Sequence, residues 1–557
     1  MELKPSEAIR DSAWFVSLWQ NDPTVQSCLT MLDDIQDAFA DITDLDKKLI
    51  NTNVEPVIFR FLEMTNLGME DNLYIKLNAR GKPLTSLENF KACLIGRLRS
   101  DNFEKSVSFN VSDFENLFDG KWTDLFWSKS HNDFDRTYLG FFSILLDNVK
   151  IDVDLSNPQD YNKINSQIYE TAYYTLNFLC NNSAEPRSII FKTLDNQTSP
   201  NRVLFHIVTT YLYYSHGVDS GSLSEWIRIL KNLTLNSTID NEERCLSAIS
   251  GINTLSDNWT DLLSYFSTNS KISVQGFNGE QIEEEQIKAR IIRINTTGDF
   301  AKLIYAAEQH PYFSGQIRSA LYFAKAGENN FDEKIFAQYW RKVSELFDND
   351  KSKYGHLLRQ ALLAYGDYTL SVSSGYKTLC VDNPNEMQSS LKRLFSKNSD
   401  IVKKILGTLK AGKDIDVQLE EIKNNVPVPR NDWRYCFIKF PDLFNWMSSS
   451  YLRLGHSYNG IIIVPNISSR GYNYDVFLGA LYLSLRQNNI DSYLEGDMGA
   501  WGNRYLCVNK MIVIFKDNNF IVTNTSIEST VFETKTEDII TEATDYFRKA
   551  ANEMEKA

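Results

Sequence analysis

Residues Tyr74 to Ala92 read YIKLNARGKPLTSLENFKA. Within this stretch, apolar Ile75 and Leu77 alternate with polar neighbours, a pattern that predicts a half-buried strand. Gly81 then supplies a turn, and Thr85 with Glu88 three residues later forms a capping box, which predicts a helix from residue 86 to about 100. The stretch therefore predicts a strand, a glycine turn and a capped helix in direct succession.

The loop before this helix carries the candidate site residues. Free backbone amides at a helix N-terminus favour anions. Asn78, Arg80 and Lys82 lie in the loop as donors for a phosphate or a nucleic-acid backbone, and Gly81 leaves the turn without a Cβ. Because the same succession of elements recurs throughout α/β proteins, its geometry alone does not decide between a phosphate site and an ordinary turn.

Basic residues gather in the same unit, although the chain as a whole is acidic. The formal net charge of −14 argues against a surface coated in positive charge for indiscriminate nucleic-acid binding. Arg80, Lys82, Lys91, Arg97 and Arg99 nevertheless fall within one strand, loop and helix. We expect a bound nucleotide or DNA to lie here, with Arg97 and Arg99 more typical of a solvated helix face.

Four stretches of the chain resemble one family. The run from Tyr74 to Thr85, followed by Glu88 and Lys91, resembles the second signature of the GmrSD-type restriction-enzyme N-terminal family. Three further stretches resemble segments before and after this signature: Trp19 to Ile35 (WQNDPTVQSCLTMLDDI), Gly120 to Trp127 (GKWTDLFW) and Glu308 to Phe323 (EQHPYFSGQIRSALYF). The likeness covers approximately residues 1 to 325.

The resemblance implies a fold, an activity and partners. Proteins of this family carry a ParB/sulfiredoxin-like nucleotide-handling module, are often joined to an HNH nuclease, and serve in modification-dependent restriction of phage DNA. By resemblance, Asn78, Arg80, Gly81 and Lys82 would complete a nucleotide- or phosphate-binding pocket, with Arg80 and Lys82 neutralising phosphate charge and Asn78 orienting the ligand. The resemblance suggests a nucleoside triphosphate with a divalent metal as cofactor and DNA as a partner, and leaves the nucleotide's identity open.

The first departure from the family is its leading signature, Asp-Gly-Gln-Gln-Arg, which occurs nowhere in these residues. The chain opens on a predicted helical segment, Ser6 to Gln20, and only Pro56 to Glu63 and Asn72 to Leu77 read as strands in the first hundred residues. Two strands with unpaired edges are unstable alone. We therefore expect the missing strands to come from a neighbouring polypeptide, or the gene to be truncated or to have a shifted start.

The second departure is the lack of a recognisable nuclease. An HNH site needs a metal-binding histidine with partner residues, whereas the six histidines here are scattered: His131, His206, His216, His310, His356 and His456. None lies in a metal-binding pattern, so no metal site is predicted and each is expected to be an ordinary polar or helix-end residue. Pro311 after His310 predicts the start or a kink of a helix. The catalytic residues stay unknown, and the chain alone is expected to be catalytically silent.

Length and composition indicate a folded protein of several domains. The 557 residues exceed one ordinary domain, and a hydrophobic fraction of 43% with 33 Phe, 27 Tyr and 10 Trp supplies a large core. No apolar run is long enough to span a membrane and no secretory leader is visible, so a cytoplasmic location with no membrane partner is expected. Seven Cys without a C-x-x-C pair predict buried thiols, including Cys28, Cys93 and Cys180.

The predicted fold class is α+β and predominantly helical. We expect three parts: residues 1–105, the second half of the ParB/sulfiredoxin-like module; 106–425, an irregular helical array without a fixed repeat; and 426–557, a small C-terminal α/β domain. The boundary follows from the prolines of NNVPVPR, Asn424 to Arg430, which interrupt a helical stretch. In the helical array, apolar stripes predict helices at 138–147, 164–181, 202–214, 223–233 and 334–346.

The C-terminal part is expected to contain a strand at 460–465, a helix at 475–486, a hairpin of 504–515 with 519–523 turned by Asp517-Asn518, and a last helix at 536–554. Its Arg-Gly loop, NISSRG at 466–471, has no matching motif, although such a loop suits a phosphate. A metal-dependent nuclease site would require carboxylates such as Asp491, Glu495 and Asp497 beside a strand lysine. Lys510 has no acidic residue two positions before it, so we interpret 495–499 as an ordinary acidic loop.

Two further expectations concern side chains. Glu284 and Lys288 stand four residues apart in an acidic block, which predicts an exposed helix supported by an ion pair. Trp14, Trp19, Trp122 and Trp127 are expected to be packing aromatics rather than base-stacking platforms.

Two functions of different class follow. The first is a component of a GmrSD-like, modification-dependent restriction or phage-defence system, contributing part of a nucleotide- or DNA-handling site that a second chain with the missing signature completes. The alternative is a non-catalytic DNA- or protein-binding scaffold, or a truncated remnant of such an enzyme, in which the loop is a structural relic. An adjacent upstream reading frame encoding the missing signature would favour the first.

Overall fold

The computed structural model describes residues 3–49 and most of 85–556, leaving out 101–102, 130–132, 156, 182–184, 295–297, 328–329, 349–350, 374, 381–389, 398–399, 448–450, 455–460, 465–472, 497–503, 525–526 and 533–535. The chain divides into two units, residues 1–84 and 85–557. The predicted strands 56–63 and 72–77, and the candidate residues Asn78, Arg80, Gly81 and Lys82, lie outside the described residues.

The described part of the first unit is helical. It holds α1 (Pro5–Arg10), the 3-10 helix η1 (Ser17–Asn21), α2 (Pro23–Phe39) and α3 (Leu45–Leu49). The predicted single helix over 6–20 is wrong, because α1 ends at Arg10 and a turn over 11–14 followed by an extended Val16 separates it from η1. The predicted start of α2 is confirmed: the Asp22 side chain accepts from the amides of Thr24 and Val25, and Pro23 occupies the first turn.

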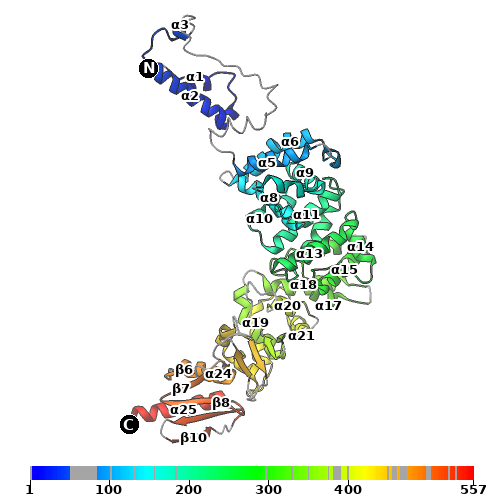
Figure 1. Cartoon of the computed structure of the whole chain (residues 1–557). Helices are drawn as coiled ribbons and strands as arrows, with labels where there is room; N and C mark the ends of the chain where they lie inside the picture. The colour runs from blue at the N-terminus through cyan, green and yellow to red at the C-terminus, as the bar shows by residue number, and fades with distance from the viewer. Residues whose placement is uncertain are drawn as a thin grey trace. The chain divides into compact units, whose positions relative to one another are not determined.

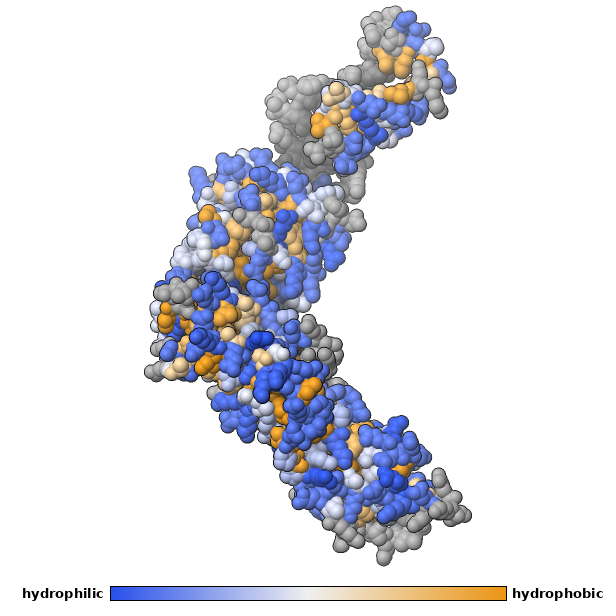
Figure 2. Space-filling view, turned by 180° about the vertical axis from the view of Figure 1, so that it is seen from behind, coloured by the Kyte–Doolittle hydropathy of each residue, from blue (hydrophilic) through white to orange (hydrophobic). Residues whose placement is uncertain are grey.

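Apolar side chains remain at the surface of this unit, as the orange atoms at the top of Figure 2 show. Trp14 is 63% exposed, Met31 56% and Ile35 44%. Trp14 and Trp19 are not core residues, but each packs edge-on against Phe15, as expected of packing aromatics. The expectation of a buried Cys28 thiol is wrong, because Cys28 is exposed. The other two tryptophans lie in the second unit. Trp122 is fully buried, whereas Trp127 is 48% exposed and packs edge-on against Phe134.

The second unit begins with the capped helix. In α5 (Ser86–Leu98), the Thr85 hydroxyl accepts from the Glu88 amide and the Glu88 carboxylate accepts from the Thr85 amide at 2.7 Å. Two backbone amides that would otherwise lack partners are satisfied, which explains why the helix begins at Ser86. The predicted capping box is confirmed.

Helices follow one another from α5 to α19 (Figure 1). Their bounds are α6 (Val111–Asp119), α7 (Lys121–Trp127), α8 (Phe134–Asn148), α9 (Ser166–Asn181), α10 (Glu185–Asp195), α11 (Ser199–Tyr214), α12 (Leu223–Leu235), α13 (Glu242–Leu255), α14 (Leu262–Thr268), α15 (Gly279–Ile294), α16 (Asp299–Glu308), α17 (Arg318–Ala324), α18 (Glu333–Phe347) and α19 (Lys351–Tyr365), with 3-10 helices η2 (Glu104–Ser106), η3 (Pro158–Lys163) and η4 (Ser256–Asn258). The five helices predicted from apolar stripes are present as α8, α9, α11, α12 and α18.

One helix is buried on every side and organises this region. Helix α11 contacts α8, α9, α10, α12 and α13, and its residues from Val203 to Leu212 are almost all buried. A helix that is apolar all round belongs in the interior of a helical assembly. Around it lies an aromatic-rich core that includes Phe114, Trp122, Tyr138 and Trp226.

The rest of the unit combines short helices with two antiparallel sheets. The helices are α20 (Leu391–Phe395), α21 (Asp400–Thr408), α22 (Ile415–Asn425), α23 (Trp433–Lys439), η5 (Pro441–Met447), α24 (Val476–Gln487) and α25 (Ile539–Lys556). The first sheet runs in the order β1 (Leu370–Ser373), β2 (Tyr376–Thr378), β3 (Tyr451–Leu454), β4 (Ile461–Val464) and β5 (Tyr474–Asp475). Its β1–β2 hairpin lies in the stretch predicted to be helical throughout, and β2 pairs with β3 across the proline-rich segment.

The second sheet has the order β10 (Ile527–Phe532), β9 (Asn519–Asn524), β8 (Met511–Lys516), β7 (Arg504–Val508) and β6 (Ser492–Gly496), beside α24 and α25 in Figure 1. The predicted turn at Asp517-Asn518 is confirmed, since both residues have positive φ. The predicted single strand over 504–515 is wrong: Asn509 and Lys510, also at positive φ, turn it into a hairpin. The predicted strand at 460–465 and the helices at 475–486 and 536–554 are present as β4, α24 and α25.

The described chain is thus α+β and predominantly helical, as predicted. The three predicted domains stay a prediction. No helix in the described ranges is both long and apolar enough to cross a lipid bilayer.

Candidate functional site

The basic residues of α5 and its C-terminal cap differ in how far nearby carboxylates neutralise their charge. Lys91 forms an ion pair with Asp119. Arg99 makes two bonds of 2.6 Å to the two oxygens of Glu115, the paired geometry that arginine favours with a carboxylate. The solvated-face interpretation of Arg99 agrees with its exposure, and its charge is compensated by Glu115.

Arg97 differs from both neighbours, because it is half-buried and no described carboxylate pairs with it. Its guanidinium lies 4.4 Å from the centre of the Phe103 ring, a cation–π contact, and its Nη1 donates to the Ser100 hydroxyl at 3.4 Å. Its Nε is buried without a hydrogen-bond partner. The expectation that Arg97 belongs to a solvated face is therefore wrong.

Arg97 lines a cavity of about 610 Å³ between the end of α5 and the start of α9. Apart from Phe103 and Ile164 the lining is polar or charged. It includes Lys163 at the end of η3, and Asn165 and Ser166 at the N-terminus of α9. Lys163 pairs with Asp160 at 3.0 Å, and the Asn165 side chain accepts from the Ile168 amide. We call this cavity the Arg97 pocket; a cation, a partly exposed aromatic ring and a helix N-terminus are groups that suit a phosphate with an attached ring.

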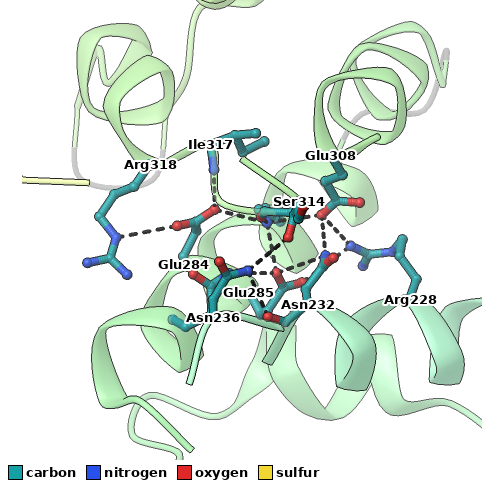
Figure 3. A network of polar contacts seen from close by, with 12 residues as sticks. Arg228, Asn232, Asn236, Glu284, Glu285, Glu308, Ser314, Ile317 and Arg318 are labelled. Atoms are coloured by element: carbon teal, nitrogen blue, oxygen red, sulfur yellow. Dashed lines mark hydrogen bonds and ion pairs between the residues drawn. The ribbon is translucent and has the colours of Figure 1, made fainter. Parts of the chain in front are cut away.

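A second concentration of charge lies in the interior, where α12, α15, α16 and the turn before α17 meet (Figure 3). We call it the buried ionic network. Its members are polar residues from four segments of the chain, and all are buried or nearly so: Arg228, Asn232, Glu284, Glu285, Lys288, Glu308 and Arg318.

Lys288 is the centre of this network. Its side chain is 0% exposed, and its ammonium group lies 2.9 Å from Glu284, 2.7 Å from Glu285 and 3.0 Å from Glu308. It also donates to the Gly315 carbonyl. Three carboxylates thus share one ammonium group, a set that is stable in the interior only when further cations and donors complete it.

Two arginines and an amide complete the set. Arg228 lies 2.8 Å from Glu308 and 3.3 Å from Glu285, and Arg318 lies 3.4 Å from Glu284. Asn232 Nδ2 donates to Glu308 at 2.8 Å and to Glu285 at 3.1 Å. Three cations therefore face three buried carboxylates, and the exposed Glu280 pairs with Arg318 at the rim.

The prediction of an exposed helix over the acidic block is wrong. Glu284 and Lys288 do pair across one helical turn, but both side chains are 0% exposed. The i, i+4 spacing is the same in a buried and in an exposed pair, so spacing alone does not distinguish them. The groups that surround the pair come from residues 308–318. The Ile317 amide donates to Glu284 at 2.7 Å, and the Arg318 guanidinium lies near the same carboxylate. The Glu308 carboxylate and the Gly315 carbonyl contact Lys288.

That segment is the family-like stretch from Glu308 to Phe323. Helix α16 ends at Glu308, and His310 to Gly315 form a tight turn in which the Ser314 amide donates to the His310 carbonyl. The expectation that Pro311 starts or kinks a helix is wrong, since α17 begins at Arg318. The turn instead presents a carboxylate, a carbonyl, an amide and a guanidinium to the network.

Burial raises the pKa of Glu285 to about 7, and the neighbouring Glu308 adds to this rise against Lys288 and Arg228. Burial alone would lower the pKa of Lys288, but the carboxylates of Glu284, Glu285 and Glu308 outweigh it and raise that pKa above its ordinary value. A carboxyl group that titrates near neutral pH beside a permanently charged lysine is unusual and marks the network as a candidate for function or for pH-dependent stability.

The pKa of Glu285 predicts a pH-dependent stability. Unfolded Glu285 titrates near its ordinary value of 4.5, and the folded group near 7. Between these values the folded state holds the extra proton, so stability falls as pH rises through this window and is constant above it. The free energy of unfolding of the wild type, minus that of Glu285→Gln, should fall by about 1–3 kcal/mol from about pH 5 to about pH 8 in urea titrations. A difference that is independent of pH would contradict the prediction.

The described histidines contact neighbouring side chains through hydrogen bonds or ring packing. His206 on α11 is buried and hydrogen-bonded to Asn253 at 2.8 Å, and burial lowers its pKa to about 4. His131 and His456 lie outside the described residues. Among the residues that the structure describes, no three His, Cys, Asp or Glu side chains are arranged to hold a metal ion.

The C-terminal candidates do not come together as a site in the described residues. Glu495 lies in β6, opposite Tyr505, and accepts from the Cys507 thiol at 3.6 Å, so it belongs to a strand rather than to the predicted loop. Asp497 and the loop 466–471 lie outside the described residues. Asp475 caps α24, and its partial burial raises its pKa to about 7.

Sequence reasoning therefore placed the site at 78–82 and missed the buried ionic network. No local sequence motif marks Arg228, Asn232 or Glu308 as members of the network. The one sequence feature that could have pointed to the network is the set of polar residues in the segment 308–318. Comparison with family models, with curated proteins and with solved structures finds no match to this chain. The likeness of four stretches to the GmrSD-type family accordingly stays a prediction.

Proposed function

We propose that this chain is a component of a GmrSD-like, modification-dependent restriction or phage-defence system and contributes part of a nucleotide- or DNA-handling site. The likeness of residues 74–91 to the family's second signature motivates the proposal. The observation that carries it is the Arg97 pocket, which lies at the far end of the helix that this signature begins.

The chemistry of the pocket suits a nucleotide. Arg97 brings a positive charge that no described carboxylate neutralises, and Phe103 offers a partly exposed ring beside it. The start of α9 adds the partial positive charge of a helix N-terminus. The volume of about 610 Å³ falls in the range of pockets that hold small organic ligands. In this arrangement the Arg97 guanidinium would bind a phosphate of the nucleotide, and the Phe103 ring would stack on its base.

In this proposal the chain supplies positioning and charge neutralisation rather than a complete catalytic set. Asn78, Arg80, Gly81 and Lys82 would form a second phosphate-binding loop at the start of the module, separate from the Arg97 pocket, which a second chain bearing the Asp-Gly-Gln-Gln-Arg signature completes. A nucleoside triphosphate with a divalent metal would be the cofactor, and DNA the target. The chain alone would bind ligand weakly and would not hydrolyse it.

Replacement of Arg97 tests the pocket directly. Arg97→Ala should weaken binding of a nucleoside triphosphate to the purified full chain about tenfold, because a charge-assisted bond to phosphate is lost. Arg99→Ala, on the same helix but paired with Glu115, is the matched control and should change the dissociation constant less than about twofold. Isothermal titration calorimetry at low ionic strength gives both constants. Equal effects of the two variants, or no effect of Arg97→Ala, would refute this assignment.

One observation favours the alternative of a non-catalytic scaffold. Lys91 of α5 and Arg99, the residue that caps its C-terminus, are held in ion pairs and are thereby withdrawn from a ligand. A scaffold would bind DNA or a protein without hydrolysing nucleotide. Absence of nucleotide binding in both the wild type and the variants would favour it.

A further inference from the structure

A groove with a volume of about 630 Å³ runs along α22, and none of the functions above uses it. One wall is a single face of this helix with its N-cap, at the i, i+3, i+4 spacing of neighbours on a helix: Asp414, Val417, Gln418, Glu421, Ile422 and Asn425. The other wall comes from Tyr365 of α19, Thr408 of α21 and the loop between α21 and α22. Residues 414 to 425 span about 16 Å at the rise of an α-helix, so the groove is elongated.

Part of the lining is apolar. Val417 is 55% exposed in the groove, and Ile422, Val426 and the ring of Tyr365 also line it. The Tyr365 hydroxyl is hydrogen-bonded to the Thr408 hydroxyl at 2.8 Å, so the polar end of this ring is satisfied. An exposed apolar side chain in a concave site favours a ligand that removes it from water.

Opposite charges lie at separate places along the groove. Lys410 and Lys413 precede α22, and Glu421 lies about two turns into the helix. Among the residues that the structure describes, none forms an ion pair with these three side chains. Asp414, the remaining charged residue of the lining, caps the helix and accepts from two of its backbone amides. The groove therefore offers two cations and one carboxylate that are not compensated within the described chain.

The loop that carries both lysines is held in place. The Gln418 side chain accepts from the Lys410 amide at 2.7 Å and donates to the Lys413 carbonyl at 3.4 Å. The Gly412 amide donates to Glu345 of α18 at 2.9 Å. Because the loop is already ordered, it loses little conformational freedom when a ligand binds.

The spacing of the charges defines the shape of the ligand. Lys413, Val417 and Glu421 stand four residues apart, so they present a cation, an apolar side chain and a carboxylate at intervals of about 6 Å along the helix axis. In an extended peptide, side chains at positions i, i+2 and i+4 lie on one face at intervals of about 7 Å. The two spacings agree over this length, whereas a small organic acid reaches only one of the charges.

We infer that this groove binds an extended peptide segment of a partner protein in which an acidic, an apolar and a basic residue occupy alternate positions. The acidic residue pairs with Lys410 and Lys413, the apolar residue covers Val417, and the basic residue pairs with Glu421. A nucleic-acid strand is a poorer ligand, because it has no cation for Glu421 and its phosphates are repelled by that carboxylate. The site is separate from the Arg97 pocket and does not depend on the function proposed above.

Titration calorimetry of the full chain at low ionic strength tests the inference, with the end-blocked pentapeptide Asp-Thr-Leu-Thr-Arg as the probe. One peptide should bind per chain. The double variant Lys410→Glu with Lys413→Glu should bind it about tenfold more weakly, because attraction for the acidic residue becomes repulsion. The peptide Arg-Thr-Leu-Thr-Arg should restore binding to the double variant, and it should bind the wild type more weakly than the first peptide does.

Two single variants make the result specific. Lys404→Glu is the matched control, since Lys404 is an exposed lysine of α21 outside the groove, and it should change the dissociation constant less than about twofold. Val417→Asn should weaken binding about threefold, because the apolar contact is lost. All four replaced side chains are exposed, so the fold should stay intact, which circular dichroism checks.

Three results would overturn the inference. They are failure of the first pentapeptide to bind the wild type in the millimolar range, an effect of Lys404→Glu as large as that of the double variant, and failure of Arg-Thr-Leu-Thr-Arg to restore binding to the double variant.

Discussion

Replacement of Lys288 by methionine is expected to lower the free energy of local unfolding around α15 by about 3–5 kcal/mol. The substitution keeps the length and apolar stem of the side chain but removes the ammonium group. Glu284, Glu285 and Glu308 then remain buried with two arginines in place of three cations. An uncompensated carboxylate in the interior either pays a large desolvation penalty or takes up a proton.

Hydrogen exchange of the α12, α15 and α16 amides measures this change directly, because it reports the free energy of local opening. Lys302→Met on α16 is the matched control, since Lys302 is 78% exposed and forms a surface ion pair with Asp299; it should change that free energy by less than about 0.5 kcal/mol. Adding Glu285→Gln to Lys288→Met should restore part of the loss, because the two residues are in contact. Equal exchange in Lys288→Met and Lys302→Met would contradict the account.

Replacement of Gly315 by alanine is expected to destabilise the same region by about 2–4 kcal/mol. Gly315 has a φ of +91°, and a Cβ there would lie 2.1 Å from the Oδ1 atom of Asn232. Asn232 cannot move aside freely, because its amide donates to Glu285 and Glu308. The variant therefore combines backbone strain with displacement of a buried hydrogen-bonding side chain.

Gly221 separates the two contributions. It has a φ of +88°, but no atom lies within 4 Å of a Cβ built there. Gly221→Ala should therefore show the strain alone, about 1 kcal/mol. The midpoints of urea unfolding, compared for the two variants and the wild type, measure the difference. If Gly221→Ala is as destabilising as Gly315→Ala, then contact with Asn232 is not the cause.

Local signals in the sequence predicted local structure well. The capping box of Thr85 and Glu88 and the Asp22 cap with Pro23 are both present, because a cap is satisfied within three residues of the chain. The apolar stripes of α8, α9, α11, α12 and α18 likewise identify helices, since periodicity reports the face that is buried.

Features that depend on distant partners could not be predicted in the same way. Glu284 and Lys288 have the spacing of a surface pair, and only the return of Glu308, Gly315 and Arg318 to α15 places them in the interior. The β1–β2 hairpin is short, and its pairing with β3 joins residues more than seventy positions apart, such as Lys377 and Leu452. Trp14 is the opposite case: its large aromatic side chain suggests a buried position, but it is 63% exposed in its unit.

The candidate site was predicted in part. The sequence directed attention to α5 and its basic residues, and the Arg97 pocket lies at the end of that helix. It could not separate Arg97 from Arg99, because the ion pair of Arg99 with Glu115 of α6 is formed between helices. The residues from 78 to 82 lie outside the described part of the chain, so their role rests on the family resemblance alone.

Reconstitution with a second chain shows whether this chain supplies part of a nucleotide-hydrolysing site. Nucleoside triphosphate hydrolysis should be measured for the full chain alone and after co-expression with a chain carrying the Asp-Gly-Gln-Gln-Arg signature, with Arg80→Ala as the control variant. The account predicts hydrolysis only by the pair, and its loss in Arg80→Ala. Hydrolysis by this chain alone, or a pair that neither binds nor hydrolyses nucleotide, would contradict it.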